Sequence, residues 1–449
     1  MRRPPPRACQ HASDLSTAPR LATFGVVQIG GFDALEVKAI FVNFWVTIRH
    51  HSLLDYITVM QDDTELPVPV LNSETAVFVN LAVYIAPLFT IQLDNSTHLL
   101  FSTVLFRILD TLPSSIKMAT AYAAVHAHPS GPGDARPTAL QIVQDEGLEQ
   151  KLTEKVILIT GCSSGIGVET ARALSKTGAR LYVTARNEEK AKAALGDLLE
   201  MKNVQLLKLD LNSLAGVRAF VKEFLSKSEK LNILINNAGV MATPEGQTED
   251  GFETQFATNH LAPFLLFQLL KPALLRASEP NFASRVVMVS SSAHRFSEVE
   301  FDNINLEGIY DPWKAYGQSK TATIWASNEI ERRYGSRNLH AFSVHPGGIS
   351  TGLQKHVPQE IVDQWTSHET MGPNWKNTEQ GAATTVWAAM SKALEGTGGK
   401  YVEDCQIAGP WDPETGEMGS GYAPWVYNED KAVKLWEMSI ELVGLQKGE

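Results

Sequence analysis

Residues 156–167 read Val-Ile-Leu-Ile-Thr-Gly-Cys-Ser-Ser-Gly-Ile-Gly, four apolar residues that run directly into a glycine-rich turn. A short apolar run is typical of a strand that is buried on both faces in a parallel sheet. The next ten residues, 168–177, predict a helix that Gly178 ends. A strand, a glycine turn and a helix in this order can hold a pyrophosphate, because backbone N–H groups and the helix dipole favour an anion there. Taken alone the turn is weak evidence, since glycines after a strand can simply close a loop.

The alternation of apolar runs and helical patterns continues along the chain. We expect further strands at 180–185, 204–209, 232–235, 285–289 and 340–344, and helices at 188–201, 214–228, 256–276 and 315–334. Strands that alternate with helices favour a parallel sheet covered on both faces, with right-handed crossovers. The predicted fold class is therefore α/β, a Rossmann-type doubly wound parallel sheet in a single large domain.

The N-terminal part of the chain has a different character. Residues 1–117 show neither strand–helix alternation nor a recognisable motif, and the Gly- and Pro-rich segment 131–137 reads as a connector. We expect an N-terminal extension and linker over residues 1–135, weakly structured or disordered, and a folded domain over residues 136–449. Because Met118 stands just ahead of the regular pattern, residues 1–117 are either a dispensable extension or a mis-assigned start.

Composition narrows the class of protein. A formal net charge of −11 repels nucleic acid, and no run of Lys and Arg opposes it, so we expect no nucleic-acid partner. The three cysteines, Cys9, Cys162 and Cys405, are scattered, which fits neither a disulfide framework nor a metal cluster. We therefore predict a reducing, cytoplasmic location and no metal site.

One segment raises the question of membrane contact. Residues 75–93 carry no charge over a length close to the roughly 20 residues that span a bilayer. Asn80, Pro87 and Gln92 interrupt this segment, which weakens the hydropathy argument. A buried hairpin or helix is the favoured interpretation, and a membrane anchor is the alternative.

Tyr316 and Lys320 stand four residues apart in a predicted helix, so their side chains share one face. A fixed cation stabilises phenolate over phenol, and we expect it to lower the pKa of Tyr316 from about 10 toward neutrality. Such a phenol can give or take a proton in alcohol–carbonyl chemistry. A buried tyrosine on an ordinary amphipathic helix is the alternative, and the glycine turn upstream argues against it.

Three motifs occur in order: Gly-x-x-x-Gly-x-Gly at 161–167, Asn-Asn-Ala-Gly at 236–239, and Tyr316-x-x-x-Lys320. With them, the chain from about residue 136 to 449 resembles the short-chain dehydrogenase/reductase family. Ala-Thr-Asn-His-Leu-Ala-Pro-Phe at 257–264 and Val-Ser-Ser-Ser-Ala-His at 289–294 are most similar to its retinol-dehydrogenase-like branch and to related reductases of fungal secondary metabolism. The resemblance implies an oxidoreductase that interconverts a small-molecule carbonyl and an alcohol.

The same resemblance implies roles for individual residues. Asn259 would hold a helix irregularity and a water of a proton relay, and Ser291 would polarise the substrate oxygen, with Ser292 as the reserve. Tyr316 would exchange the proton, and Lys320 would tune it and hold the nicotinamide ribose. The implied coenzyme site consists of Gly161, Ser163, Gly165, Ile166, Gly167, Arg186, Asp210, Asn237, Tyr316, Lys320, Ile349 and Thr351.

The end of the second strand bears on the choice of coenzyme. An NAD-preferring site usually has an acidic residue there to bind the ribose 2′-hydroxyl, whereas this chain has Ala185 followed by Arg186. A guanidinium binds phosphate through a planar fork, so we predict NADP(H). A solvated loop arginine is the alternative interpretation of Arg186.

Several alternatives stay open at this stage. The chain could be an NADP-binding scaffold or sensor without turnover, or a membrane-associated alcohol dehydrogenase for retinoid-like or steroid-like substrates. The resemblance also implies a homodimer through the helices of Asn259 and Tyr316, although some relatives stand alone. Residues 353–380 lack regular periodicity, and we expect a substrate-covering loop there.

Overall fold

The computed structural model describes residues 122–416 and 419–446 of the 449-residue chain, all within one compact unit. The segment 75–93 and nearly all of the expected N-terminal extension lie outside the described residues. None of the helices in the described ranges combines the length and the apolar character that a bilayer crossing requires.

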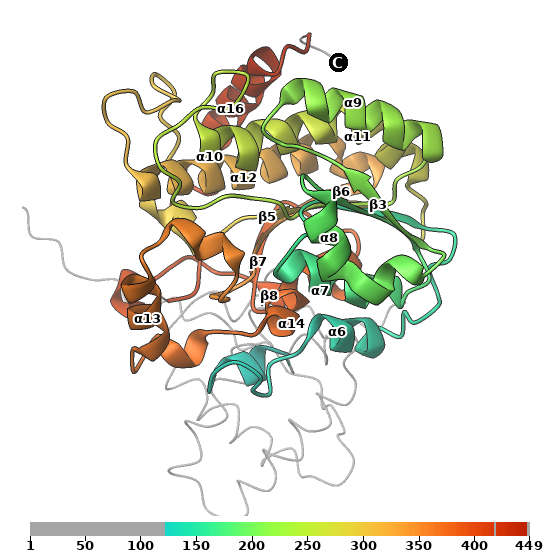
Figure 1. Cartoon of the computed structure of the whole chain (residues 1–449), viewed down its shortest axis with the longest axis horizontal. Coiled ribbons are helices and arrows are strands. Elements are labelled where there is room, and N and C mark those ends of the chain that lie inside the picture. Colours follow the sequence, from blue (N-terminus) through green and yellow to red (C-terminus); the bar gives the residue numbers. More distant parts are fainter. Residues whose placement is uncertain (1–121, 417–418, 447–449) are drawn as a thin grey trace, which may run out of the picture. The chain divides into compact units, whose positions relative to one another are not determined.

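An eight-stranded sheet forms the centre of this unit, in the order β3-β2-β1-β4-β5-β6-β7-β8 (Figure 1). All neighbouring strands are parallel except β7 and β8. The order reverses between β1 and β4, and a crevice at the carboxyl ends of the strands is expected at such a point. The strands are β1 Val156–Ile159, β2 Arg180–Ala185, β3 Val204–Lys208, β4 Ile233–Asn236, β5 Ser284–Val289, β6 Leu339–His345, β7 Lys400–Glu403 and β8 Gln406–Ile407.

Helices cover both faces of the sheet, as Figure 1 shows with α9, α11 and α16 on one side and α6 and α14 on the other. Strand β1 explains the two layers, because Val156 and Leu158 enter one apolar core while Ile157 and Ile159 enter the other. The helices are α6 Ala139–Asp145, α7 Ile166–Ser175, α8 Glu188–Leu195, α9 Leu214–Lys227, α10 Thr254–Phe256, α11 Ala262–Ala277, α12 Pro312–Tyr334, α13 Gln359–Ser367, α14 Thr378–Gly381, α15 Ala383–Met390 and α16 Glu429–Leu442.

The predicted α/β fold and its doubly wound parallel sheet are confirmed, and the differences are local. Helix α8 ends at Leu195 rather than at 201, because Gly196 adopts a positive φ of 49° and a 3-10 turn follows. The segment 353–380 contains α13 and α14, which its irregular polarity did not reveal. Strands β7 and β8 and helices α15 and α16 were not predicted.

The C-terminal helix α16 packs on the outer side of α11 and α12. The ring of Trp436 meets Phe264 edge-on at 4.9 Å, and the guanidinium of Arg333 lies 4.7 Å from the same indole. The chain therefore covers part of these helices with its own C-terminal segment. The homodimer implied by the resemblance stays a prediction.

Residues 122–135, which the sequence assigned to the linker, contact the sheet domain. The Tyr122 hydroxyl donates to Asp145 in α6 at 2.7 Å, and the backbone N–H of Gly133 donates to Gln380 in α14 at 2.8 Å. The boundary between residues 135 and 136 stays a prediction. The structure adds that the segment just before it is held against the fold by specific bonds.

Candidate active site

A cavity of about 560 Å³ opens along the carboxyl ends of the strands. With the exception of Asn259, every residue that the sequence predicted for the site lines this one cavity. These lining residues are Gly161, Ser163, Gly165, Ile166, Gly167, Arg186, Asp210, Asn237, Ser291, Tyr316, Lys320, Ile349 and Thr351.

The glycine turn after β1 leaves no room for a side chain at Gly161 or at Gly167. A Cβ on Gly161 would lie 2.8 Å from the Cα of Ala238, and one on Gly167 would lie 2.4 Å from the Gly161 carbonyl oxygen. The φ of Gly161 is +78° and that of Gly165 is +64°, values that favour glycine. Asn237 fastens the turn, since its Nδ2 donates to Thr160 O at 2.8 Å.

This turn fits the phosphates of a dinucleotide. Helix α7 begins at the turn, and among the described residues no side chain caps it. Its first N–H groups and the positive end of its dipole are therefore directed at an anion in the cavity. The Oδ1 atom of Asn237 is buried without a partner in the described part of the chain, which leaves an acceptor for a ligand hydroxyl beside the turn.

The ends of β2 and β3 supply the polar groups at one end of the cavity. Arg186 directly follows β2 and is exposed, and Asp210 lies two residues beyond β3. The Asp210 carboxylate accepts from the backbone N–H of Asn212 at 3.0 Å. Lys190, one turn into α8, lines the same end and was not predicted. Its place in the first turn of the helix that follows Arg186 could have revealed it, because that helix starts beside the end of β2.

Tyr316 and Lys320 lie at the centre of the cavity, on helix α12. Asp311 caps this helix by accepting from the backbone N–H groups of Trp313 and Lys314, at 2.9 and 2.7 Å, and Pro312 fills its first position. Each of the two side chains is 4% exposed, and the ammonium lies 5.5 Å from the phenol ring centre. The predicted helical face is therefore present.

The carboxyl end of β5 and the residues just after it complete this centre. The Lys320 ammonium donates to the carbonyl of Val289, the last residue of β5, at 2.9 Å. Ser291 follows two residues later, and its side chain forms a hydrogen bond with Tyr316. The neighbouring Ser290 hydroxyl donates instead to the Lys320 carbonyl at 3.0 Å, away from the phenol. The strand end thus brings Ser291, Tyr316 and Lys320 together.

The predicted lowering of the Tyr316 pKa is wrong for this structure. Burial raises the pKa of Tyr316 to about 12, and the hydrogen bond with Ser291 offsets this only in part. Burial also lowers the pKa of Lys320 to about 8. The prediction counted the nearby cation and omitted the desolvation of the phenol, which opposes its ionisation. At neutral pH Tyr316 is consequently a protonated phenol, the form that can donate a proton.

Asn259 lies behind the cavity, 3% exposed, in a π-helical turn at Ala257–Leu261 between α10 and α11. Its side chain exchanges two hydrogen bonds with the Val240 backbone, each of 2.9 Å, and its Nδ2 also donates to Ser319 Oγ at 2.9 Å. Ser319 Oγ in turn donates to the Tyr316 carbonyl at 2.8 Å. The expected helix irregularity is present, and the water relay stays a prediction.

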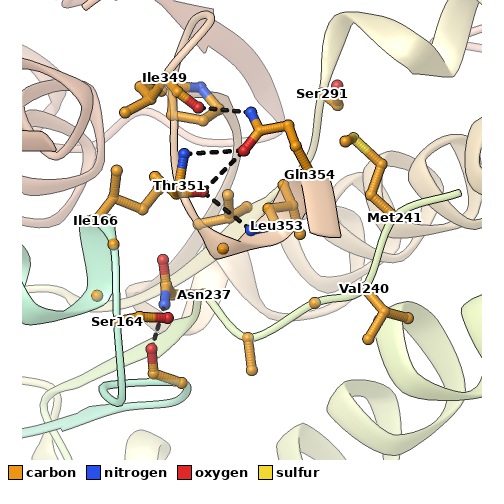
Figure 2. Close-up of a pocket in the computed structure, with 18 of the residues that line it drawn as sticks. Ser164, Ile166, Asn237, Val240, Met241, Ser291, Ile349, Thr351, Leu353 and Gln354 are labelled. Carbon is orange, nitrogen blue, oxygen red and sulfur yellow. Dashed lines mark hydrogen bonds between the residues drawn. The ribbon is translucent and has the colours of Figure 1, made fainter. Parts of the chain in front are cut away.

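The loop after β6 forms another wall, which Figure 2 shows together with Asn237 and Ser291. Gln354 links its two predicted residues, because Nε2 donates to Ile349 O at 2.6 Å and Oε1 accepts from the Thr351 backbone N–H at 2.8 Å. Gln354 was not predicted. The Thr-x-x-Gln spacing at 351–354 is the sequence signature of a capping box and could have revealed it.

The other end of the cavity is aromatic and apolar. Trp313 meets Trp365 of α13 edge-on with ring centres 5.8 Å apart, and it meets Phe296 and Tyr316 at 6.4 Å each. Further apolar side chains lining the cavity are Met241, Leu353, Met371 and Trp375. The segment 353–380, where a substrate-covering loop was expected, supplies Trp365, Met371 and Trp375 to this wall, and its role as a cover stays a prediction. Nothing in the sequence pointed to Trp313.

The sheet order, the glycine turn and the group of Ser291, Tyr316 and Lys320 define a Rossmann-type α/β protein with a built ligand cavity. Residues 155–361 match the short chain dehydrogenase family. The chain is 52% identical over 326 residues to the short-chain dehydrogenase/reductase prx1 of Penicillium roqueforti, covering 73% of this chain and 96% of the relative. Retinol dehydrogenase 12 of Mus musculus is 38% identical over 295 residues, covering 65% and 87%.

A crystal structure of an uncharacterised protein from Mycobacterium Paratuberculosis is also similar, with 31% identity and a TM-score of 0.50, covering 65% of this chain and 94% of that one. The chain belongs to the short-chain dehydrogenase/reductase family, and it is an oxidoreductase of the retinol-dehydrogenase-like and fungal branch.

Proposed function

We propose that this oxidoreductase uses NADP(H) to interconvert an apolar carbonyl compound and its alcohol, with Ser291, Tyr316, Lys320 and Asn259 as its catalytic set. The observation that carries the proposal is the meeting of Ser291, Tyr316 and Lys320 in the cavity that also contains the uncapped start of α7. A protein that only sensed a coenzyme would have no use for all three groups beside one another.

When bound, the nicotinamide coenzyme supplies or takes up the hydride. The residues of the chain handle the proton and the developing charge. In the reducing direction, the Tyr316 phenol donates its proton to the carbonyl oxygen, and the Ser291 hydroxyl stabilises the same oxygen through a second hydrogen bond. The protonated phenol expected from a pKa of about 12 suits this role.

Lys320 and Asn259 support Tyr316 in the transfer of the proton. The Lys320 amine, with its pKa lowered to about 8 by burial, carries its charge at neutral pH and stabilises the phenolate left after proton transfer. A Cβ on Gly239 would lie 3.0 Å from Asn259 Oδ1 and 3.5 Å from Lys320 Nζ, so these two polar groups border the same small space. Proton return toward Tyr316 through a water in that space is the role proposed for Asn259.

The preference for NADP(H) rests on charge. Arg186 and Lys190 lie at the end of the cavity next to β2, where Ala185 replaces a carboxylate. A guanidinium and an ammonium in that position favour a ribose 2′-phosphate over a 2′-hydroxyl. The aromatic end of the cavity favours a substrate with an apolar body next to the carbonyl.

The test is Tyr316→Phe, assayed by NADPH consumption with a panel of aldehydes and ketones and by direct titration of NADPH. We expect loss of turnover of about 10²–10⁴-fold, because the proton donor is removed, with coenzyme affinity nearly unchanged. Turnover equal to that of the unaltered protein would refute the assignment. Failure of the unaltered protein to consume NADPH with any carbonyl would favour a non-catalytic binding protein.

A further inference from the structure

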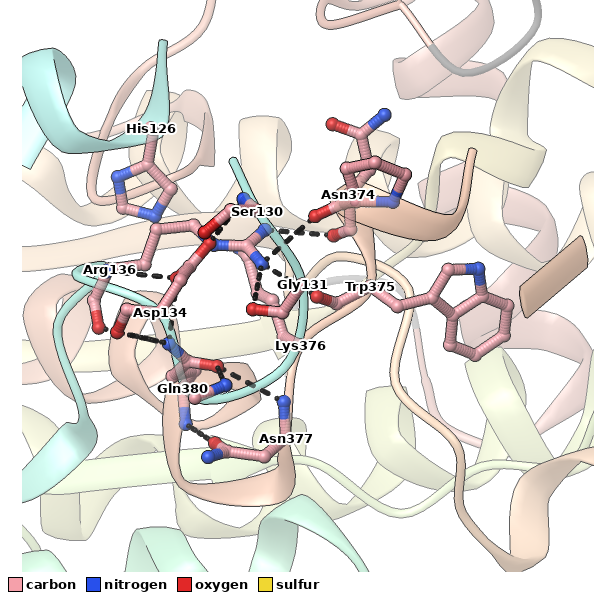
Figure 3. Close-up of polar contacts among 12 residues, drawn as sticks. His126, Ser130, Gly131, Asp134, Arg136, Asn374, Trp375, Lys376, Asn377 and Gln380 are labelled. Carbon is pink, nitrogen blue, oxygen red and sulfur yellow. Dashed lines mark hydrogen bonds and ion pairs between the residues drawn. The ribbon is translucent and has the colours of Figure 1, made fainter. Parts of the chain in front are cut away.

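A short segment before the family-matched region is bonded to a loop far along the chain. Residues 130–136 precede the matched residues 155–361, and the loop at 372–377 follows them. Figure 3 shows the two segments side by side, joined by the side chains of Arg136, Asp134 and Gln380. None of the three is part of the catalytic set.

Arg136 contacts the loop through both terminal nitrogens of its guanidinium. It is 4% exposed, and Nη1 donates to Asn374 O at 2.9 Å. Nη2 donates to Pro373 O at 3.2 Å and to Trp375 O at 2.6 Å. Three consecutive carbonyls of one loop thus accept from one side chain. A planar fork with several donors can do this, whereas a lysine ammonium cannot match the same geometry.

Asp134 and Gln380 hold the guanidinium in its place. Asp134 Oδ1 accepts from Arg136 Nε at 2.8 Å and from the Arg136 backbone at 3.0 Å. Burial alone would raise the pKa of Asp134, but the bonds from Arg136 and Ser130 outweigh it and lower the pKa to about 2. Gln380 of α14 donates to the same carboxylate at 3.0 Å and to Arg136 O at 3.2 Å.

The clamped loop supports the wall of the cavity formed by residues 346–349. The backbone N–H of Lys376 donates to Gly348 O at 2.8 Å, and the indole of Trp375 lies against Gly348. In Figure 3 this indole extends away from the Arg136 guanidinium. Trp375 lines the cavity, and its indole N–H is buried without a partner in the described part of the chain.

Helix α14, which carries Gln380, packs directly against residues that line the cavity. A Cβ on Gly381 would lie 2.5 Å from Ile349 Cγ1 and 3.0 Å from Ile166 Cγ2. Helix α14 therefore contacts both the loop after β6 and the start of α7. A displacement of Gln380 would be transmitted to both walls, because packed neighbours at such distances cannot move independently.

We propose that Arg136 is a positioning residue, which holds the 372–377 loop and α14 so that residues 346–349 and Trp375 face the bound coenzyme and substrate. The inference rests on the proposed function for its ligand, and on Arg136, Asp134 and Gln380 for its mechanism. It makes residues 130–136 part of the working enzyme rather than of a linker.

The test compares Arg136→Lys with Arg285→Lys in the full chain. Arg285 is a matched control, since it is also 4% exposed and donates to carbonyls, those of Ala388 and Ser391 at 3.2 and 3.0 Å. It lies near the start of β5, at the amino ends of the strands, and does not line the cavity. Both changes should lower the Tm. Only Arg136→Lys should weaken NADPH binding, raise KM and lower kcat, together by about tenfold or more.

A second measurement does not depend on the coenzyme. In the protein without NADPH, hydrogen exchange at the Lys376 amide should be at least about tenfold faster in Arg136→Lys and unchanged in Arg285→Lys. Equal exchange rates and equal NADPH affinities in the two variants would overturn the proposal. If Arg136→Lys does not fold, Asp134→Asn gives the same contrast in milder form. Absence of NADPH binding in the unaltered protein would refute the proposed function. The exchange rates would still show whether Arg136 holds the 372–377 loop in place.

Discussion

The glycine-turn end of the cavity and its aromatic end are built in different ways. At the first end, Gly161, Arg186 and Asp210 come one or two residues after β1, β2 and β3, so the sheet itself fixes their positions. At the second end, Trp313, Trp365 and Met371 come from a helix start, a short helix and a loop. Sheet topology therefore sets the glycine-turn end, whereas a helix start, a short helix and a loop set the aromatic end.

The largest effect should come from Lys320, where the two ends meet. We expect Lys320→Met to lower the rate of reduction by about 10²–10⁴-fold, because the cation beside Tyr316 is lost. In the unaltered enzyme the rate should be steady below pH 8 and fall above it, since Lys320 with a pKa of about 8 loses its charge there. Tyr316, with a pKa of about 12, stays protonated throughout.

The pH profile of the variant is the decisive measurement. In Lys320→Met the fall in rate above pH 8 should disappear. The Tm of the variant, measured over the same pH range, excludes unfolding as the cause. A profile with the same fall in both proteins would assign the titration to another group and separate Lys320 from the proton transfer.

A smaller effect is expected from Arg186, which tests the sheet-fixed end alone. Arg186→Gln should weaken NADPH binding by about ten- to a hundredfold, because a hydrogen bond to a charged group contributes about 1.5–3 kcal/mol. Its affinity for NADH should change little. Isothermal titration with both coenzymes measures this, and an equal loss for the two would place Arg186 away from the 2′-position.

Substitutions at the aromatic end of the cavity should change KM for the carbonyl substrate but not the affinity for NADPH. Trp365 lines the cavity, and an aromatic contact with a bound substrate is worth about 0.5–1.5 kcal/mol, so Trp365→Ala should raise KM for a bulky apolar carbonyl by about two- to tenfold. NADPH affinity should not change. Trp411→Ala is the control, since Trp411 does not line the cavity and instead lies under the Arg295 guanidinium. The same KM in both variants would contradict a substrate wall at Trp365.

The smallest effect is expected at the N-terminus. A chain that starts at Met118 should keep its turnover, its NADPH affinity and its Tm, because it retains Arg136 and the contacts of Tyr122 with α6. A chain that starts at Thr138 should lose NADPH affinity. Loss of activity in the first chain would show that residues 1–117 contribute to the enzyme.

Much of the fold could be predicted from the sequence, because buried parallel strands are continuous apolar runs. Strands β1 and β2 have the predicted bounds, β3 and β5 differ by one residue at one end, and β4 and β6 differ by one residue at each end. The short strand β7, Lys400–Glu403, which lies between β6 and β8, begins and ends with a charged residue, so its sequence is not the continuous apolar run of a buried strand. The meeting of the glycine turn, Asn237 and Ser291 followed from the same pattern, since these residues come after β1, β4 and β5 and the carboxyl ends of parallel strands lie together.

The rest depends on tertiary contacts. Arg136 and Trp375 are 239 residues apart, and no local sequence pattern predicts their hydrogen bond. The aromatic wall needs α13 to fold against the start of α12. The pKa of Tyr316 depends on how much of the phenol is buried, which spacing along a helix does not reveal.

The π-helical turn at Ala257–Leu261 has a consequence for the length of this segment. One residue more than in an α-helical turn advances the following helix by roughly 100°. This phase shift allows Asn259 to face Val240 while Phe264 and Phe267 still face Trp436. After deletion of a single residue there, the helix could keep either the contact of Asn259 with Val240 or those of Phe264 and Phe267 with Trp436, but not both. Insertions and deletions in this helix are therefore expected to be far more damaging than substitutions.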